Sequence, residues 1–419
     1  MARKAKRDLT VEEQLARGPV DLPLLMLTLL LLGVGLIMVL SASYATAYYD
    51  PKTDSPLAYA VAQTRYAVLG LVAMYFVSKF NYQYLRILSL PMLVGSIVLL
   101  ALVPTPLGVT LNGAQRWLKI LLVAGPTFQP SEIAKIAVIL FFAARLSKRD
   151  PEKRKKKKWN RRTRLGRALE WLEKVGFLEL VPYGGVLLLI AGLLLLEPHL
   201  SGTILVLAGG AAVLFAAGIS LRWFALGIGV VAGGLWFVVT LTPYMTSRIQ
   251  LWLDPWSDPL GKGYQTIQSL YAIGSGGLLG RGLGKSSQKF LFLPEAENDF
   301  IFSVAVEELG MIGGIMILGL FMLFILRGYW LALHARDRFG ALVGVGITTL
   351  FAVQVFLNIG VVTNLIPNTG ISLPFFSYGG TALIIQLAEV GIMLSISRQI
   401  PAPKQDSMWR KPPPPPPRA

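Results

Sequence analysis

The chain has 419 residues, of which 54% are hydrophobic and only 15% are charged, and its mean hydropathy is +0.58. A soluble globular domain has about one quarter charged residues, so this composition excludes an ordinary soluble protein. Cysteine is absent and the only histidines are His199 and His334, which excludes disulfide frameworks, thiolate metal sites and histidine-rich zinc sites.

Ten apolar runs follow one another along the chain, each close to the ~20 residues that a helix needs to cross a bilayer. They predict helices over residues 22–43, 60–79, 85–103, 131–146, 180–197, 201–219, 222–242, 300–326, 339–360 and 377–396. The first run has no convincing cleavage site and is predicted to be an anchor. The predicted fold class is all-α: a polytopic membrane protein with about ten transmembrane helices and a long extracytoplasmic loop between helices 7 and 8.

The formal net charge of +17 follows this topology. With the N-terminus inside, five segments rich in Lys and Arg all fall on the cytoplasmic side, as the positive-inside rule requires. They are residues 3–17, 79–86, 145–174, 327–338 and the tail after 398. Both termini are therefore expected in the cytoplasm, and the basic segments are expected to contact anionic membrane lipids rather than nucleic acid.

Three regions divide the chain: a basic cytoplasmic segment over 1–21, a membrane domain over 22–398 and a proline-rich cytoplasmic tail over 399–419. The polybasic cytoplasmic loop 147–178 contains an amphipathic stretch, 163–177, which is expected to lie as a helix on the inner membrane surface or else to be a solvated linker helix. The prolines 412–417 either dock an aromatic groove as polyproline II or form a disordered end.

Two predicted outer loops, residues 104–130 and 243–299, are long for simple connectors, since loops beyond about 12–15 residues are usually functional or disordered. The second is rich in Trp, Tyr, Ile and Leu, which argues for order. Its many glycines favour tight turns and re-entrant or interfacial pieces, in which backbone N–H groups can face an anion. Residues 264–273 have helical spacing and are predicted to lie at the membrane interface.

Several ionisable side chains fall inside or beside the predicted spans, where charge is costly unless it is paired or faces a polar cavity. Glu132 and Lys135 are three residues apart on one helix, so they share a face and can pair. This pair is either structural, or it lines a cavity below the outer loops and tunes its charge. Glu307 and Glu308 either hold neighbouring helices together or serve that cavity. The other ionisable side chains inside or beside the predicted spans are Glu197 and Glu389.

Asp299 stands at the outer start of the eighth predicted span, directly before the apolar residues Phe300–Phe302. A carboxylate there either caps the helix by accepting backbone N–H groups or acts in catalysis, and the residues alone leave both interpretations open. His199 lies in the tight outer turn between the fifth and sixth spans, where a lone histidine is more often a turn residue than a catalytic base.

Five sequence motifs occur in order between these helices. They are residues 112–117 (NGAQRW), 129–135 (QPSEIAK), 254–277 (DPWSDPLGKGYQTIQSLYAIGSGG), 282–310 (GLGKSSQKFLFLPEAENDFIFSVAVEELG) and 374–380 (PFFSYGG). Together they resemble the SEDS family, the shape, elongation, division and sporulation proteins, over about residues 22–398. The forms DPW and GLGKSSQKFLFLPE are more similar to its division and sporulation branch, FtsW and SpoVE, than to its elongation branch, RodA.

This resemblance implies a peptidoglycan glycosyltransferase of the bacterial cytoplasmic membrane. It implies that lipid II is polymerised into undecaprenyl-linked glycan strands on the outer face, during cell division or cell-shape determination. The implied partners are a class B penicillin-binding protein and other divisome proteins. The implied functional residues are an essential aspartate, here Asp299, with Arg116, Trp117 and the Glu132–Lys135 pair.

Three positions depart from the pattern of the family. The turn that usually reads PDLGT is PHLSGT here, so His199 replaces the usual aspartate and no role of that aspartate carries over. Glu297 and Asn298 replace the usual histidine and threonine, which adds negative charge before Asp299. Thr369 stands where a lysine or serine is often found.

The implied reaction fits these residues. A sugar hydroxyl attacks the anomeric carbon of a lipid-linked chain and expels lipid pyrophosphate, a good leaving group, so one carboxylate base and positive charge suffice. Asp299 is the candidate base. The candidate substrate-binding residues are Arg116, Lys119, Arg248, Arg281 and Lys285 for phosphate, with Trp117, Glu132 and Lys135 beside them. No metal site made by the protein alone is predicted, but Asp299 and the pyrophosphate together are candidate ligands for a divalent cation, magnesium or manganese.

Two other classes of function stay open. A lipid II flippase needs a polar path across the membrane, for which Glu132, Lys135 and Glu389 are the candidate residues. A non-catalytic divisome scaffold would recruit partners through the polybasic loop and the proline tail.

Overall fold

The computed structural model describes residues 18–51, 53, 55–111, 114–119, 127–149, 163, 167, 170, 173, 176–197, 199–241 and 249–400. The predicted N-terminal segment before residue 18, most of the polybasic loop, the proline tail beyond residue 400 and Arg248 lie outside the described residues.

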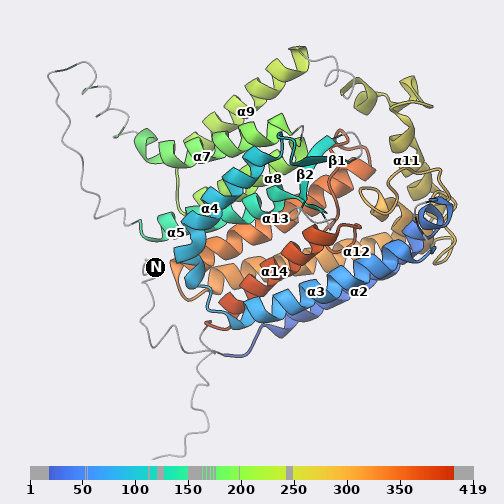
Figure 1. Ribbon diagram of the computed structural model, residues 1–419, viewed down its shortest axis with the longest axis horizontal. Helices are drawn as coiled ribbons and strands as arrows, with labels where there is room; N and C mark the ends of the chain where they lie inside the picture. The colour runs from blue at the N-terminus through green and yellow to red at the C-terminus, as the bar shows by residue number, and fades with distance from the viewer. Residues whose placement is uncertain are drawn as a thin grey trace, which may run out of the picture.

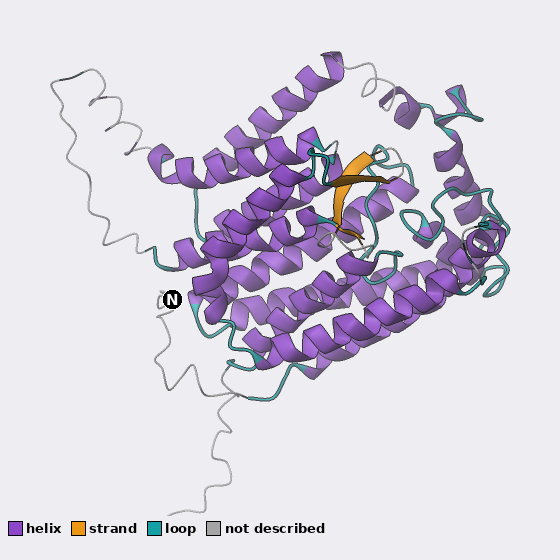
Figure 2. Ribbon diagram, in the orientation of Figure 1, coloured by secondary structure: helices purple, strands orange, loops and turns teal. Residues whose placement is uncertain are grey.

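Within the described residues, ten helices match the ten predicted spans one for one (Figures 1 and 2). They are α2 (Leu22–Tyr49), α3 (Ala58–Lys79), α4 (Tyr84–Leu102), α5 (Pro130–Ser147), α7 (Phe177–Leu196), α8 (Leu200–Ala216), α9 (Leu221–Leu241), α12 (Ile301–His334), α13 (Arg338–Val362) and α14 (Gly380–Ser397). All except α5, α8 and α9 are long and apolar enough, by length and composition, to cross a membrane. The prediction of an all-α polytopic membrane protein is confirmed.

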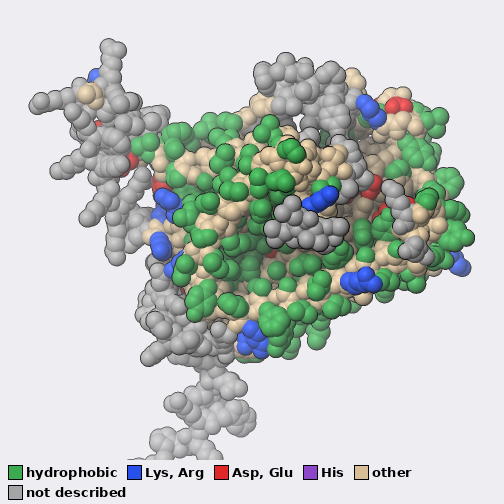
Figure 3. All heavy atoms as spheres, in the orientation of Figure 1, with side chains coloured by type: hydrophobic (Ala, Val, Ile, Leu, Met, Phe, Trp, Pro, Cys, Tyr) green, Lys and Arg blue, Asp and Glu red, His purple; other side chains and the backbone are tan. Residues whose placement is uncertain are grey.

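Successive helices alternate in direction, so the bundle has two distinct ends. At the end that we call the terminal end, the first and last described segments meet: the amide of Gly18 donates to the oxygen of Arg398 at 2.7 Å, and the amide of Asp21 donates to Ser397 Oγ at 3.1 Å. At the opposite end, the loop end, lie the described parts of the connections 103–129, 249–300 and 363–379. Figure 3 shows hydrophobic side chains covering most of the flank between the two ends, as expected of a surface that faces lipid.

A small antiparallel sheet at the loop end was not predicted from the sequence. It consists of β1 (Gly108–Leu111), β2 (Ala114–Lys119) and β3 (Thr127–Phe128), in the order β1-β2-β3. The strands are very short and their apolar residues do not form a long run, so the hydropathy pattern shows only a loop. The sheet holds β2, with its Arg116, at the loop end, which matters for the site.

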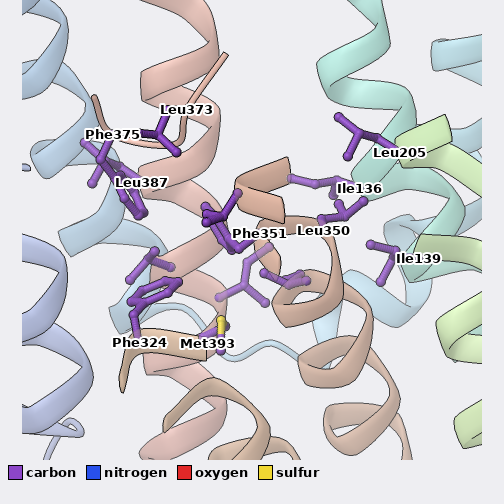
Figure 4. Close-up of a cluster of buried hydrophobic side chains, with 14 of the residues drawn as sticks. Ile136, Ile139, Leu205, Phe324, Leu350, Phe351, Leu373, Phe375, Leu387 and Met393 are labelled. Atoms are coloured by element: carbon purple, nitrogen blue, oxygen red, sulfur yellow. The ribbon is translucent and has the colours of Figure 1, made fainter. Parts of the chain in front are cut away.

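The loop after α13 enters the bundle as a re-entrant segment, residues 371–379. Its Phe375 packs against Phe324 of α12 and Phe351 of α13, with ring centroids 5.6 and 5.3 Å away (Figure 4). Gly35 of α2 lies directly against the main chain of Phe375, and a Cβ on Gly35 would collide with the Phe375 oxygen. Irregular backbone at this depth is tolerated only when the protein supplies its hydrogen bonds.

Amide side chains of three helices supply those hydrogen bonds. Gln63 of α3 donates to the oxygen of Ser377 at 3.0 Å, and Gln354 of α13 donates to the oxygen of Ser372 at 3.0 Å. Gln386 of α14 accepts a hydrogen bond from the amide of Phe375 at 3.1 Å. The re-entrant segment is therefore held in one conformation by α3, α13 and α14.

Helix α12 is interrupted at Gly310, where φ is 73° and the main chain is not helical. There the amide of Arg281 donates to the oxygen of Glu307 at 3.0 Å, and the amide of Met311 donates to the oxygen of Gly277 at 2.9 Å. A continuous helix of 34 residues would be ~51 Å long, well beyond a bilayer core of ~30 Å. The part beyond Gly310 matches a single span, and the first part, with Glu307, belongs to the loop end.

The helix predicted over 264–273 is confirmed as α11 (Tyr264–Gly276), preceded by a single 3-10 turn, η1 (Pro255–Ser257), while its place at the membrane interface stays a prediction. α11 packs against α12. Ser269 of α11 donates to the oxygen of Val362 at 2.7 Å and lies 2.7 Å from the hydroxyl of Ser303. The long loop is thus ordered and rests on the bundle.

Candidate functional site

Asp299 is half-buried at the loop end, immediately before α12. The N-cap residue of α12 is Phe300, and no side chain caps this helix. Among the described residues, no group donates a hydrogen bond to the Asp299 carboxylate. The interpretation of Asp299 as a helix cap is therefore wrong, and its carboxylate is left available for another partner.

The backbone around Asp299 is firmly held although its carboxylate is not. Asn358 of α13 donates to the main-chain oxygen of Asp299 at 2.8 Å, and Ser377 donates to the oxygen of Asn298 at 2.7 Å. The amide of Tyr378 donates to the oxygen of Glu297 at 2.8 Å. The re-entrant segment thus fixes the position of Asp299, which is the preorganisation that a catalytic group needs.

Gly370 lies beside the Asp299 carboxylate. A Cβ on Gly370 would stand 3.3 Å from Asp299 Oδ2, and the φ of Gly370 is 67°, in the left-handed region that favours glycine. Ser201, in the first turn of α8, donates to the oxygen of Gly370 at 3.5 Å. The α7–α8 turn therefore borders the Asp299 site.

The surroundings of Asp299 make it a weaker acid than usual. Burial raises the pKa of Asp299 to about 6, the nearby Glu295 carboxylate acts in the same direction, and the positive charge of Arg116 opposes them. A carboxylate with this pKa is largely ionised at neutral pH and still accepts a proton readily, which is the property of a good general base.

Arg116 of β2 is the predicted binding residue that the fold brings to Asp299. The pairing of β1 with β2 is irregular at this point: Gln115 pairs with Thr110 and Trp117 with Val109, so Arg116 is the extra residue of a bulge. The charge of Arg116 acts on Asp299, on Glu197 and on His199. Trp117 is half-buried and Lys119 is exposed.

Glu132 and Lys135 form the predicted ion pair, with Lys135 Nζ 2.8 Å from Glu132 Oε2 in the first turns of α5. Both side chains are buried. Their charges also act on Glu389 of α14, and the charge of Lys135 acts on His199. The pair therefore lies between α14 and the α7–α8 turn, close beneath the loop end.

Arg281 and Lys285 are placed elsewhere. Arg281 Nη1 lies 3.3 Å from Glu307 Oε1 and also contacts Ser287, while Lys285 is exposed in the following turn. Glu307 lies eight residues after Asp299, about two helical turns along α12. The described contacts of Arg281 and Lys285 are with residues of the loop and of α12, and not with Asp299. Arg248 lies outside the described residues.

Glu307 and Glu308 have a structural role. Glu308 accepts hydrogen bonds from the amide of Gly284 at 3.0 Å, from Ser41 at 2.6 Å and from Lys289 Nζ at 3.0 Å. Glu307 accepts hydrogen bonds from the loop between residues 286 and 288. We call Glu307, Glu308 and Lys289 the loop clamp, because they fasten residues 281–289 to α12 and α2.

Sequence reasoning missed Lys289 and gave little weight to His199. Lys289 was not among the basic loop residues singled out from the sequence, although the adjacent glutamates 307 and 308 in an apolar run signal that a cation must reach them. His199 is the N-cap residue of α8, but its side chain makes no capping hydrogen bond. Its Nε2 lies 3.2 Å from Gln129 Nε2. Burial, together with Arg116 and Lys135, lowers the pKa of His199 to about 3, so its imidazole is neutral.

Five of the described bundle helices begin at the loop end, and none of them has a side-chain cap: α3 at Leu57, α5 at Gln129, α8 at His199, α12 at Phe300 and α14 at Gly379. At the terminal end, Asp21 caps α2 and Asp337 caps α13, whereas α4 and α7 have no side-chain cap. Helix N-termini carry partial positive charge and free N–H groups, which attract anions. The loop end is therefore suited to an anionic ligand, and Asp299 stands beside it.

The described residues contain no group of three or more His, Cys, Asp or Glu side chains that would hold a metal ion by themselves. A cation at this site would need oxygen ligands from the substrate in addition to Asp299.

The sequence profile of a family described as Cell cycle protein matches residues 22–401. Stage V sporulation protein E of Bacillus subtilis (strain 168) is 44% identical over 381 residues, which cover 90% of this chain and 97% of that protein. The probable peptidoglycan glycosyltransferase FtsW of Geobacter metallireducens is 40% identical over 384 residues, 91% of this chain and 95% of that protein.

Two solved structures share the fold. One is a chain from a study of how a peptidoglycan synthase complex coordinates polymerization and crosslinking, with a TM-score of 0.67 at 31% identity, covering 90% of this chain and 98% of that one. The other is the rod shape determining protein RodA of Thermus thermophilus, with a TM-score of 0.61 at 28% identity, covering 91% and 97%.

Proposed function

This chain belongs to the SEDS family of cell cycle proteins, which includes FtsW, RodA and SpoVE, and we propose that it polymerises lipid II at a site built around Asp299. It is a multi-pass membrane protein and a peptidoglycan glycosyltransferase. The observation that carries the site is the state of Asp299: its backbone is fixed by Asn358, while its carboxylate accepts no hydrogen bond from the described residues.

In this reaction a sugar hydroxyl attacks the anomeric carbon of the lipid-linked chain. The new C–O bond forms as the bond from the anomeric carbon to the phosphate oxygen breaks, and the lipid pyrophosphate leaves with the electron pair. Asp299 takes the proton of the attacking hydroxyl, and its pKa of about 6 suits that task near neutral pH. The proton is then released to solvent.

Positive potential stabilises the charge that develops on the leaving pyrophosphate. Arg116 supplies a full charge, and the uncapped N-termini of α5 and α8 supply partial charges and N–H donors. A divalent cation, magnesium or manganese, would be held by Asp299 and the pyrophosphate oxygens and would add charge neutralisation there. Binding of manganese in the presence of a polyprenyl diphosphate, lost in Asp299→Asn, would test that ligand set.

The loop end faces the outside of the cytoplasmic membrane in this proposal, and both termini lie in the cytoplasm. The terminal end carries described basic residues, among them Arg149, Arg338 and Arg398, as the positive-inside rule requires of a cytoplasmic face. The prenyl tail of lipid II then stays in the bilayer while its sugars reach Asp299.

A class B penicillin-binding protein is the proposed partner, with other divisome proteins. The support is the similarity to a chain of a peptidoglycan synthase complex that joins polymerization to crosslinking. The FtsW and SpoVE names of the relatives support a role in division or sporulation.

The decisive experiment is polymerisation of lipid II by the purified full-length protein with its penicillin-binding partner. Asp299→Asn keeps the size of the side chain and is expected to lower turnover by about a hundredfold or more, the usual contribution of a general base. Asp50→Asn, a change at another half-buried carboxylate of the loop end, serves as the matched control. Full turnover by a folded Asp299→Asn protein would refute the assignment, and continued transbilayer movement of labelled lipid II would then favour a flippase.

A further inference from the structure

Glu197 is a buried carboxyl group that nothing in the fold satisfies. It follows the last residue of α7 and is only 2% exposed. Among the described residues, neither of its carboxylate oxygens has a hydrogen-bond partner. A buried polar group without a partner costs free energy, so a native protein that keeps one commonly uses it to meet a ligand.

The surroundings of Glu197 indicate which ligand that is. The charge of Arg116 acts on Glu197 as it does on Asp299. The same short turn continues through His199 to Ser201, and Ser201 contacts Gly370, which borders the Asp299 carboxylate. Glu197 and Asp299 are therefore both within reach of the Arg116 charge, and the α7–α8 turn connects them.

Further unpartnered polar atoms converge on this place. Ser131, in the first turn of α5, is fully buried and its hydroxyl has no hydrogen-bond partner among the described residues, and the same is true of His199 Nδ1. The uncapped N-termini of α5 and α8 are joined here by the contact of Gln129 with His199. Hydroxyls, helix N-termini and a guanidinium together are the donors that bind phosphate groups in proteins.

The protonation state of Glu197 completes the set of donors. Burial raises the pKa of Glu197 to about 8, and Arg116 opposes that effect only in part. Among the described residues, the other charged or titratable groups of the neighbouring elements are Glu132 and Lys135 of α5, which neutralise each other, Glu389 of α14, on which that pair acts, and His199, which is neutral. At neutral pH Glu197 thus carries its proton and can donate it in a hydrogen bond to an anionic oxygen.

We propose that Glu197 is a further substrate-binding residue, which together with Arg116 holds the diphosphate of the lipid-linked sugar between the α7–α8 turn and Asp299. The inference deepens the proposed function and depends on it for the identity of the ligand. Glu197 keeps its proton throughout; it binds the diphosphate by a hydrogen bond to a phosphate oxygen and takes no part in bond breaking.

The test compares two substitutions in the full-length protein with its partner. Glu197→Met keeps the volume but removes the donor, and it is expected to raise the KM for lipid II about tenfold with little change in kcat, the loss of one hydrogen bond to a charged group. Glu197→Gln keeps a neutral donor and is expected to stay within about threefold of the wild-type KM. Glu179→Met, at the other end of α7, is the matched control.

Inhibition by farnesyl diphosphate identifies the ligand group. Its Ki is expected to rise with the KM in Glu197→Met, while inhibition by the phosphate-free disaccharide pentapeptide stays unchanged. If Glu197→Met instead weakens inhibition by the disaccharide pentapeptide and leaves the Ki of farnesyl diphosphate unchanged, Glu197 binds sugar and the proposal is overturned. If Glu197→Gln is as impaired as Glu197→Met, the residue has a structural role and the proposal is overturned as well.

The pH dependence gives a signature that a structural role would not produce. Between pH 7 and 9 the wild-type KM is expected to rise, because an ionised Glu197 repels the diphosphate, whereas the KM of Glu197→Gln stays level. Asp299→Asn separates the two proposals: it is expected to lower kcat and, when the inhibition is measured without divalent cation, to leave the Ki of farnesyl diphosphate within about threefold. An unchanged kcat there would overturn the role of Asp299 alone.

Discussion

The amide side chain of Asn358 donates one hydrogen bond to the main-chain oxygen of Asp299 at 2.8 Å and a second to the oxygen of Ile371 at 2.7 Å. One buried side chain of α13 therefore ties the start of α12 to the re-entrant segment. The Asp299 carboxylate is thus positioned through its main chain and makes no hydrogen bond to the described residues itself.

Asn358→Asp retains the shape of the side chain but replaces the donor with an acceptor, so both carbonyl oxygens lose their partner. We expect a loss of about 2–4 kcal/mol in stability, since two buried groups are left unsatisfied. We also expect kcat to fall much more than KM changes. Thermal unfolding in detergent and steady-state polymerisation measure the two effects. If kcat is normal in the folded fraction, the position of Asp299 does not depend on Asn358.

The rate of polymerisation should depend on pH through Asp299, which must be ionised to act as a base. Because its pKa is about 6, kcat/KM is expected to fall about tenfold per pH unit below pH 6 and to flatten near pH 7, above which the ionisation of Glu197 lowers it through KM. A profile that is flat from pH 5 to 7 would contradict this role.

The same shift in the pKa of Asp299 predicts a gain in stability on substitution. The folded pKa lies above the ordinary value of 3.8, so ionisation of Asp299 disfavours the folded state as the pH rises through the interval from 3.8 to 6. Asp299→Asn is therefore expected to melt at a higher temperature than the wild type at pH 7 and at the same temperature near pH 3. The comparison requires only thermal scans of the two proteins at both pH values.

Arg116→Gln removes the charge that opposes the burial of Asp299. The pKa of Asp299 is expected to rise, so the acid limb of the pH–rate profile moves to higher pH, and the KM for lipid II is expected to increase. Lys119→Gln, at an exposed cation of the same strand, is the control and is expected to leave the acid limb in place. Equal shifts of the acid limb in both variants would mean that Arg116 affects Asp299 only through the net charge of the loop end and not through its position.

The loop clamp should be sensitive to removal of one partner. Lys289→Met leaves the buried Glu308 without its ammonium partner, which is expected to cost about 3–5 kcal/mol of stability. The double variant Lys289→Met/Glu308→Leu is expected to recover part of that loss, because it removes the uncompensated charge. Unfolding curves of the three proteins test this, and a Lys289→Met protein as stable as wild type would contradict the clamp.

Gly310 is required by the backbone at the interruption of α12. Its φ is 73°, and a Cβ there would collide with the main chain of Gly280. Gly310→Ala is expected to lower stability by more than about 1 kcal/mol. Gly319→Ala, in the same helix with open space around it, is expected to be neutral or stabilising. Equal melting temperatures for the two variants would show that α12 can straighten.

Much of the fold follows from local properties that the sequence displays directly. Each of the ten helices corresponds to an apolar run, and the pairing of Glu132 with Lys135 follows from their spacing on one helix. The short strands of the sheet escaped prediction, because strands of two to six residues leave no hydropathy signal that a loop does not also give.

The sequence by itself determined the membrane-spanning architecture, because burial in a bilayer demands about 20 apolar residues in an unbroken run. It also identified Asp299 as either a helix cap or a catalytic group. Only the tertiary structure decided between them, since the backbone angles at Phe300 make that residue the N-cap. The approach of Arg116 and Glu197 to this site is likewise tertiary, because it depends on how a strand, a turn and a re-entrant segment far apart in the chain pack together.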